Sequence, residues 1–460
     1  MRPRNEVARD QLTTVLARRS AASAADIAAP LGVSIPTLHW MLQSLGSAVV
    51  GTGKARRSRY ALRRDLRGEL APLPLYEVDS AGRAERLTSL DLVSPQGSCA
   101  PLNGTGWPVP EESRDGWWDG LSYFVHDMRP QGYMGRQFAR AEHRQLGVSA
   151  NPQEWGDDDI AWVLSRSGSD ASGNLILGDR AFEHWQATKL TPLEPLRTRA
   201  VGAAYARLAE LAIGAGLAGS SAGGEFPKFA VLRERAGSAT PHVLVKFSGA
   251  DRSAAVRRWS DLLVCEHVAL EAIGGMPGFA AARSRVVAHA GRTFLEVERF
   301  DRHGSFGRSR LTSLSTLDAA LIGAGTSDWT ALAGRFALVG LLDAETVERV
   351  RRLWWFGRLI ANTDMHTGNL GFVPNDTLAL APAYDMLPML YAPLPGGELP
   401  TRSFEPALPL PPPQRAVWLL ACAAALGFWD RAATDARISA AFRRTCSANA
   451  RRLREVAGLV

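Results

Sequence analysis

A short polar segment in the C-terminal half of the chain has residue types that can transfer a group between oxygen atoms. In LIANTDMHTGNLGFV, three such side chains lie within six residues: Asp364, His366 and Asn369. A carboxylate can accept the proton of an attacking hydroxyl, and an amide oxygen can bind Mg²⁺. Both flanking stretches are strongly apolar, and polar residues held between buried elements usually have a chemical task. We therefore take Asp364 and His366 as the candidate catalytic residues.

The spacing of this segment matches that of a phosphoryl-transfer loop. The five-residue step from Asp364 to Asn369 equals the step between the proton-accepting aspartate and the magnesium-binding asparagine of the kinase catalytic loop. Further on, LALAPAYDMLPML predicts an apolar strand that ends near Asp385, whose carboxylate suits Mg²⁺ beside Asn369. The alternatives are an Asx-rich turn that caps a hairpin and, for Asp385, an ordinary strand-end residue.

Upstream, GSSAGGEFPKFAVL predicts a Gly- and Ser-rich loop that leads into a strand. Small residues let backbone N–H groups approach phosphate oxygens, and the candidate phosphate contacts are Ser221, Gly223, Gly224 and Lys228. The segment lacks the GxxxxGK[ST] pattern, and Gly/Ser loops are usually turns. By itself this loop is weak evidence for a nucleotide site.

Two further segments predict the elements that must position the phosphates and the base. HVLVKFS predicts a buried strand with Lys246 in its middle, where an unpaired lysine would be costly. Its candidate partner is Glu266 in the helix DLLVCEHVALEAI, and kinases place a lysine and a glutamate in this order. TFLEVERFDR predicts a strand that ends in a charged turn at Asp301 and can hold adenine through its backbone, and we take Asp301 as a further candidate ATP contact. An edge-strand lysine with a surface glutamate is the alternative for the first pair.

Other catalytic schemes fit the sequence less well. The chain has neither HExxH nor HxxEH, no GxSxG elbow, and no GxGxxG after a first strand. Paired glycosidase carboxylates stay open, but they would leave the Gly-rich loop and Lys246 without a task.

The first seventy residues have the pattern of a helix-turn-helix, whose second helix enters the DNA major groove. ARDQLTTVLARRS predicts one helix, and SAADIAAPLGVSIPTLHWMLQSLG predicts two short helices about Gly32, capped by Ser23 and Ser34. On the last helix three apolar residues are expected in the core: Leu38, Met41 and Leu42. Three polar residues are expected to face base edges or phosphates: Thr37, His39 and Gln43.

A basic hairpin follows, which makes the predicted domain a winged helix. SAVVGTGKARRSRYAL predicts two strands with Lys54, Arg56 and Arg57 at the tip, where arginines suit phosphate or minor-groove contacts. Residues 1–68 hold twelve Lys/Arg against four Asp/Glu, a net charge of +8, whereas the whole chain carries +7. Positive charge gathered in one segment suggests a polyanionic partner, here DNA. A small helical interaction module with a solvated basic face is the alternative.

Length and composition set the broad class. A chain of 460 residues predicts two or three domains, and 46% apolar with 22% charged residues is ordinary for a globular protein. No uninterrupted apolar run reaches the length of a bilayer span, so no membrane partner is expected. The four cysteines lie far apart without a CxxC pair, which indicates reduced thiols in the cytoplasm.

The segments SSAGGEFPK, VLVKFS, VERFDR, NTDMHTGN and APAYD together resemble, in order and spacing, the HipA-like toxin kinases. With the helix-turn-helix in front, the arrangement is similar to the YjjJ-type branch of that family. The resemblance covers roughly residues 70–450. It implies an α/β (α+β), two-lobed, protein-kinase-like fold with a mostly helical C-terminal lobe. One departure is EFPK, where many relatives carry a glutamine before the Pro-Lys pair.

The resemblance also implies roles for individual residues. Asp364 would be the catalytic base, Asn369 and Asp385 the magnesium ligands, and Lys246 a contact of the ATP phosphates. Backbone groups of Glu298 and Phe300 would hold adenine. The family's autophosphorylated serine aligns with Ser221, and Ser220 is the near alternative. The expected domains are a winged helix, a HipA-like N-terminal subdomain, an ATP-binding N-lobe core and a helical C-terminal lobe, at 1–68, 69–215, 216–302 and 303–460.

The leading hypothesis is an ATP- and Mg²⁺-dependent serine/threonine kinase with fused DNA-binding control. By resemblance, its protein substrate would be a translation component such as an aminoacyl-tRNA synthetase, and a separate antitoxin is a further candidate partner. A homodimer is expected if the chain reads a palindromic DNA site. Two alternatives stay open: a transcription regulator with a kinase-like sensor or scaffold body, and a small-molecule phosphotransferase.

Overall fold

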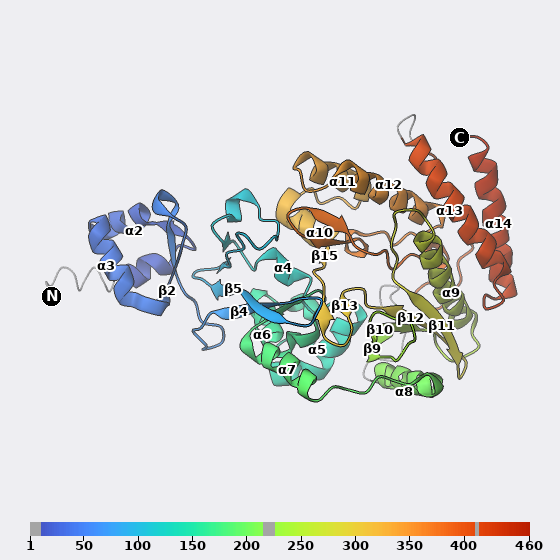
Figure 1. Ribbon diagram of the computed structural model, residues 1–460, viewed down its shortest axis with the longest axis horizontal. Coiled ribbons are helices and arrows are strands. Elements are labelled where there is room, and N and C mark those ends of the chain that lie inside the picture. Colours follow the sequence, from blue (N-terminus) through green and yellow to red (C-terminus); the bar gives the residue numbers. More distant parts are fainter. Residues whose placement is uncertain (1–10, 215–225, 410–413) are drawn as a thin grey trace. The chain divides into compact units, whose positions relative to one another are not determined.

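The computed structural model describes residues 11–214, 226–409 and 414–460 (Figure 1). The chain divides into two compact units. The first unit comprises Met1–Asp79, Arg83–Arg129 and Glu154–Leu190. The second comprises Ser80–Gly82, Pro130–Gln153 and Thr191–Val460. This division differs from the domain ranges expected from the sequence, because the N-terminal domain and most of the next region share one unit.

The N-terminal domain contains the predicted helix-turn-helix. Its three helices are residues 11–17, α2 (Ala24–Leu31) and α3 (Ile35–Leu45). Side-chain oxygens of Ser23 and Ser34 accept hydrogen bonds from the first turns of α2 and α3. Gly32 ends α2 with φ 62°, a left-handed conformation that glycine adopts without steric cost. The predicted caps and turn are confirmed.

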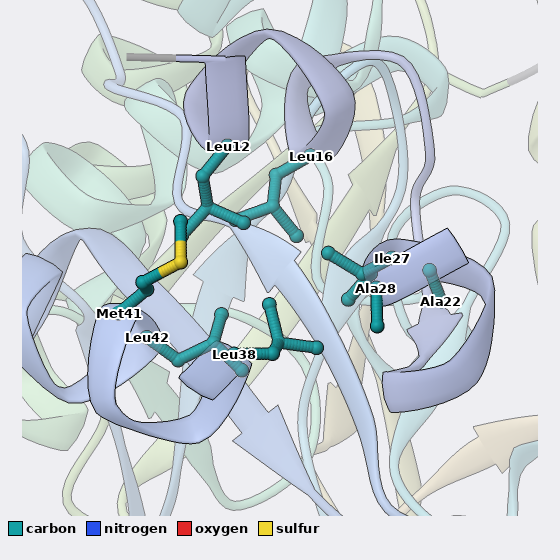
Figure 2. Packing of buried hydrophobic residues seen from close by; sticks show 8 residues of the cluster. All are labelled: Leu12, Leu16, Ala22, Ile27, Ala28, Leu38, Met41 and Leu42. Carbon is teal, nitrogen blue, oxygen red and sulfur yellow. The ribbon is translucent and has the colours of Figure 1, made fainter. Parts of the chain in front are cut away.

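The three helices enclose a small apolar core, which Figure 2 shows. α3 contributes Leu38, Met41 and Leu42, the three residues expected to face inward. The other buried members come from the first helix and from the segment around α2: Leu12, Leu16, Ala22, Ile27 and Ala28. Because this core fixes which side of α3 faces inward, the opposite side of the helix presents its polar residues to solvent.

A three-stranded antiparallel sheet completes the domain and ties it to the region that follows. Its strands, in the order β1-β3-β2, are β1 (Ala22–Ser23), β3 (Arg59–Leu62) and β2 (Val49–Thr52). β2 and β3 form the predicted wing hairpin. Val50 and Ala61 of this hairpin share a buried cluster with Val93 and Cys99 of the next region. One face of the wing is therefore part of a larger core, which explains why both regions form one unit.

The middle region is built on a five-stranded antiparallel sheet in the order β7-β6-β5-β4-β8. Its strands are β4 (Leu73–Val78), β5 (Ala84–Leu92), β6 (Ser98–Cys99), β7 (Trp117–Trp118) and β8 (Leu175–Leu177). Its helices are α4 (Tyr123–His126), α6 (Asp157–Ser167) and α7 (Asp179–Leu190). Tyr123 and Phe124 are buried beside Trp107 and form part of the core of this region.

The second unit begins with the N-lobe, a four-stranded antiparallel sheet in the order β11-β12-β10-β9. The strands are β9 (Lys228–Leu232), β10 (His242–Phe247), β11 (Ser284–His289) and β12 (Arg292–Glu298). The helices of this part are α5 (Gly132–Leu146), α8 (Val201–Gly214) and α9 (Ala254–Gly274). Tyr205 of α8 packs beneath the sheet with Val245 and Phe247, while α9 contacts β11 and β12.

The C-lobe contains short strands and most of the helices of the second unit. The strands are β13 (Arg302–His303), β14 (Gly307–Arg308), β15 (Thr312–Ser313), β16 (Gly371–Pro374) and β17 (Leu378–Leu380). The helices are α10 (Leu314–Leu317), α11 (Trp329–Leu338), α12 (Ala344–Leu359), α13 (Arg415–Thr434) and α14 (Ala440–Ala457). The last two helices lie side by side (Figure 1). The two-lobed, mixed helix-and-sheet fold expected from the sequence is confirmed.

One described helix, α13, is long and apolar enough to cross a membrane by length and composition. It packs against α9, α12 and α14, and its buried residues include Trp418, Phe428 and Trp429. The Trp429 indole donates a hydrogen bond to the Leu359 carbonyl at the end of α12. These contacts account for the apolar composition of α13 as that of a packed C-lobe helix.

Candidate phosphoryl-transfer site and nucleic-acid interface

Lys246 lies at the centre of the candidate site. β10 runs between β12 and β9, so its lysine comes from the interior of the sheet and not from an edge strand. The Lys246 ammonium lies 2.7 and 2.9 Å from the two carboxylate oxygens of Glu266 on α9. Both side chains are buried, so each charge depends on the other for compensation. The expected strand-lysine and helix-glutamate pair is thus formed.

Asp385 contacts the same ammonium group. Its backbone has φ 57°, a left-handed conformation that is uncommon outside glycine and is often found where a side chain is held for function. Burial opposes ionisation of Asp385, but the charges of Lys246 and Lys228 outweigh burial and lower the pKa to about 2. Burial also opposes the charge on Lys246, and Asp385 and Glu266 outweigh it and raise the Lys246 pKa.

Two asparagine side chains fix the loop that carries Asp364. The Asp364 N–H donates to the Asn362 side-chain oxygen at 3.0 Å, and the Asn362 amide lies 3.4 Å from the Asp385 carbonyl. The Asn369 amide donates to the Asp364 carbonyl at 2.9 Å. Asn362 is buried, whereas Asp364 is exposed. The structure therefore brings the loop next to Asp385 and leaves the Asp364 side chain accessible to a substrate.

His366 shapes the same loop. Its ring Nδ1 accepts a hydrogen bond from the Gly368 N–H at 3.1 Å, and its carbonyl accepts from the Asn369 N–H at 3.0 Å. The Trp329 indole donates to that carbonyl at 3.3 Å, and the Tyr384 hydroxyl donates to the Gly368 carbonyl at 2.9 Å. These contacts make His366 part of the hydrogen-bond network of the loop.

The residues present fit a magnesium ion that arrives with a nucleotide. Within the described parts of the chain, no three His, Cys, Asp or Glu side chains form a metal cluster. Mg²⁺ does not need one, because it is typically held by one or two protein oxygens together with phosphates and water. Asp385 supplies an ionised carboxylate whose side chain is 32% exposed. The Asn369 amide nitrogen donates to the Asp364 carbonyl, so the side-chain oxygen is the atom that would hold a metal.

The phosphate-binding side of the site is described only from residue 226 onward. Lys228 begins β9 directly opposite Lys246 in the strand register, so two lysines meet at this end of the sheet. Ser220, Ser221, Gly223 and Gly224 lie outside the described residues.

The predicted hinge follows β12. The Glu298 N–H donates to the Arg283 carbonyl at 2.8 Å, and the Glu298 side chain pairs with Arg235 at 3.0 Å. The Phe300 ring packs beside Tyr384, with ring centroids 5.7 Å apart. These contacts fix the chain at the point where its backbone would meet adenine.

Asp301 has a different environment from the one expected of an ATP contact. Its carboxylate is buried and accepts hydrogen bonds from Arg299 and Arg302, at 3.0 and 2.7 Å to the same oxygen. Both carboxylate oxygens are bonded within this turn, since Arg299 also donates to the other one at 3.1 Å. Asp301 therefore stabilises the turn after β12, and we leave it out of the proposed nucleotide site.

The candidate DNA-contacting residues occupy two places in the first unit. His39 and Gln43 are exposed on α3, whereas Thr37 is half-buried and its hydroxyl lies 2.9 Å from that of Ser34. Lys54 and Arg57 are exposed at the wing tip, and Arg56 belongs to the same turn. The α3 sequence contains no lysine or arginine. If this domain binds DNA, lysine and arginine contacts to phosphates would come from outside α3, and the wing tip carries such residues.

Three arginines of the basic segment are bound to acids of the middle region. Arg63 pairs with Asp91 at 2.8 Å, Arg64 makes a bidentate pair with Asp158 at 2.6 and 2.7 Å, and Arg67 pairs with Asp159. When these three charges are removed from the +8 of residues 1–68, about +5 is left for an external partner. These pairs and the buried face of the wing fix the domain to the middle region.

Two family descriptions match the chain: the YjjJ-like toxin middle domain over residues 69–186, and the HipA-like C-terminal domain over residues 220–451. The chain belongs to the HipA-like toxin family, as its motifs indicated. Within that family it is similar to Toxin YjjJ of Escherichia coli (strain K12), with 35% identity over 410 residues, which cover 89% of both chains.

A solved structure is similar in fold. It is a chain from the Shewanella oneidensis MR-1 toxin–antitoxin complex of HipA, HipB and operator DNA. The TM-score is 0.51 with 15% identity, and the match covers 84% of this chain and 99% of that chain. At this identity the likeness concerns the fold alone.

The sequence motifs gave no role to Asn362, two residues before Asp364, or to Tyr384, next to Asp385. Both residues hold the Asp364 loop, Asn362 through the Asp364 N–H and Tyr384 through the Gly368 carbonyl. What could have pointed to them in the sequence is their position, because each lies within two residues of an aspartate of the site.

Proposed function

We propose that the chain is an ATP- and Mg²⁺-dependent serine/threonine protein kinase of the toxin type. The observation that carries this proposal is the Lys246 ammonium, which is held between Glu266 and Asp385 beside the Asp364 loop. A scaffold without activity would have no need for these three features in one place. They are the buried Lys246–Glu266 ion pair, the left-handed backbone conformation of Asp385, and the exposed side chain of Asp364.

Each residue of the site has a defined task in this proposal. Lys246 binds the α/β-phosphates, with Lys228 as a second cation at the same end of the sheet. Asn369 and Asp385 hold Mg²⁺, which when bound neutralises charge on the phosphates. Asp364 accepts the proton of a serine or threonine hydroxyl, the hydroxyl oxygen bonds to the γ-phosphorus, and the bond from that phosphorus to ADP breaks.

Two further contacts belong to the same proposal. The backbone of Glu298 and Phe300 holds adenine at the end of β12, where Tyr384 supports the Phe300 ring. Autophosphorylation takes place on Ser221, with Ser220 as the alternative, in the loop with Gly223 and Gly224 that contacts the phosphates.

Intact mass measurement after incubation with Mg-ATP tests this proposal. We expect the wild-type chain to gain one phosphate and the Asp364→Ala variant to gain none. Asp376→Ala is a matched control, because Asp376 is exposed in the turn between β16 and β17 and lies outside the site. No gain in wild type under conditions where it binds Mg-ATP would favour the scaffold alternative.

The partners follow from the family and from the N-terminal domain. We propose a protein substrate in translation, such as an aminoacyl-tRNA synthetase, and a cytoplasmic location. The related HipA was solved with HipB and operator DNA, which supports DNA and an antitoxin as partners here. If the DNA site is palindromic, the chain binds it as a homodimer. A small-molecule phosphotransferase is the second candidate, and a screen for labelled small products against labelled proteins separates the two.

We also propose that the winged helix binds duplex DNA through Thr37, His39 and Gln43 on α3 and through Lys54, Arg56 and Arg57 on the wing. The test uses the full chain, because one face of the wing is buried in the middle region. Replacing Lys54 and Arg57 by glutamine should lower the salt-dependence slope of DNA binding by about 2. Arg444→Gln, an exposed arginine on α14, is the control. An unchanged slope would count against wing contacts.

A further inference from the structure

A cavity of about 550 Å³ lies in the C-lobe. It opens among the first turn of α11, one side of α12, the segment around Leu408 and the start of α13. None of its lining residues belongs to the proposed phosphoryl-transfer site. The volume is within the range of pockets that hold small organic ligands, which is roughly 300–1,000 Å³.

The lining combines aromatic rings with positive charge. Trp354 and Trp355 of α12 supply flat apolar surface, and Arg351 and Arg358 lie on the same helix. The Arg358 guanidinium lies 5.8 Å from the Trp354 ring centroid, and no described carboxylate is within ion-pair distance of it. Arg351 pairs with Glu348 on the exposed helix surface, and such pairs are weak.

Among the described lining residues the acidic one is Asp328, and one of its carboxylate oxygens is occupied by the cap of α11. Its carboxylate accepts hydrogen bonds from the backbone N–H groups of Thr330 and Ala331, at 2.8 and 3.2 Å, and so caps α11. An anionic ligand therefore meets Arg358, which forms no ion pair with a described carboxylate, and next to it Arg351, whose charge is shared with Glu348. The stacking surface of Trp354 favours a flat aromatic body on the same ligand.

The cavity is connected to the catalytic loop by two side chains. The Trp354 ring packs against Trp329, with ring centroids 5.6 Å apart. Trp329 is fully buried, and its indole N–H donates to the His366 carbonyl. A ligand that moves Trp354 thus acts on the indole that holds the backbone of the loop.

We propose that this cavity binds a small organic anion with a flat aromatic body, and that the bound anion acts on the Asp364 loop through Trp354 and Trp329. The first part of this proposal, binding of the anion, depends on the cavity alone and is called the binding half. The second part, the effect on the Asp364 loop, is called the coupling half and rests on the proposed kinase function.

The binding half is tested with the fluorescent aromatic anion 8-anilinonaphthalene-1-sulfonate on the full chain. Mg²⁺ and a non-hydrolysable ATP analogue are present throughout to fill the nucleotide site. We expect saturable binding with one site, and about fivefold weaker binding in Arg358→Gln. Arg349→Gln is the matched control, because it removes the same charge from the same helix but does not line the cavity.

A neutral probe of similar shape, N-phenyl-1-naphthylamine, separates charge from apolar attraction. Its affinity should not change in Arg358→Gln. Equal anion affinity in Arg358→Gln and Arg349→Gln, or binding of the anion that does not saturate, would overturn the proposed site.

The coupling half is tested by the rate of phosphate incorporation with and without saturating anion. We expect the anion to change the wild-type rate, and we expect this effect to be lost in Trp329→Phe, which keeps an aromatic ring but removes the N–H donor. Anion binding itself should be unchanged in Trp329→Phe. If saturating anion does not change the rate of phosphate incorporation in wild type, the coupling is refuted. If no phosphate is incorporated at all, the kinase proposal itself has failed.

Discussion

Replacing Lys246 by methionine removes the ammonium group that pairs with both Glu266 and Asp385, and it should destabilise the N-lobe. The Glu266 side chain is 1% exposed, so its charge would be left buried without compensation. Removing one partner of a buried ion pair costs about 3–5 kcal/mol. The Asp385 side chain is 32% exposed, so water can still solvate its charge. We therefore expect the free energy of unfolding to fall by about 3 kcal/mol, the lower end of that range.

Hydrogen exchange measures the loss of N-lobe stability at individual backbone amides. A local measurement is needed because a chain of two units does not have to unfold in a single two-state transition. Amides of β10 and α9 should lose protection by about 100-fold in Lys246→Met, the equivalent of about 3 kcal/mol. The loss should be greater at pH 8 than at pH 5. Burial already raises the pKa of Glu266 against the opposing charge of Lys246, and without that charge the folded-state pKa rises further above the unfolded value. A raised folded-state pKa gives stability that is lost as pH rises.

The double variant Lys246→Met with Glu266→Gln provides the control. It removes the uncompensated charge, so protection should largely return, while phosphate transfer stays absent because the phosphates have lost their lysine. If Lys246→Met is as well protected as wild type, or if Glu266→Gln does not restore protection, the reasoning from buried charge is wrong.

Three other outcomes are expected. The low pKa of Asp385 contributes stability that is complete above the usual value of 3.8 and is lost as pH falls toward about 2, so acid unfolding of the second unit should shift to higher pH in Asp385→Asn. Asn362→Ala should lower the rate of autophosphorylation at least tenfold while ATP affinity, measured by titration calorimetry, changes less than threefold, because the loop loses the acceptor of the Asp364 N–H. Arg64→Ala should reduce thermal stability of the first unit by about 1–3 kcal/mol through loss of the bidentate pair with Asp158, and Arg57→Ala at the exposed wing tip should not.

Much of the fold could be predicted from local patterns. The caps at Ser23 and Ser34 and the turn at Gly32 follow from backbone chemistry that acts over a few residues. The apolar segments HVLVKFS and DLLVCEHVALEAI predicted a strand and a helix where β10 and α9 lie, and the order of Lys246 and Glu266 indicated that they would pair.

What the sequence could not predict depends on contacts between distant segments. The burial of Val50 and Ala61 against Val93 and Cys99 joins the wing to the middle region, and no local pattern marks it. The same holds for Asp301, whose position after a strand suggested a ligand contact until its two arginine partners were seen.

The central claim is that Lys246, Asp364 and Asp385 form one phosphoryl-transfer centre. Its most direct test is transfer of the labelled γ-phosphate of ATP to the protein, followed over time in wild type, Asp364→Ala and the control Asp376→Ala. We predict equal incorporation in wild type and the control and none in Asp364→Ala. Equal incorporation in all three proteins would contradict the claim.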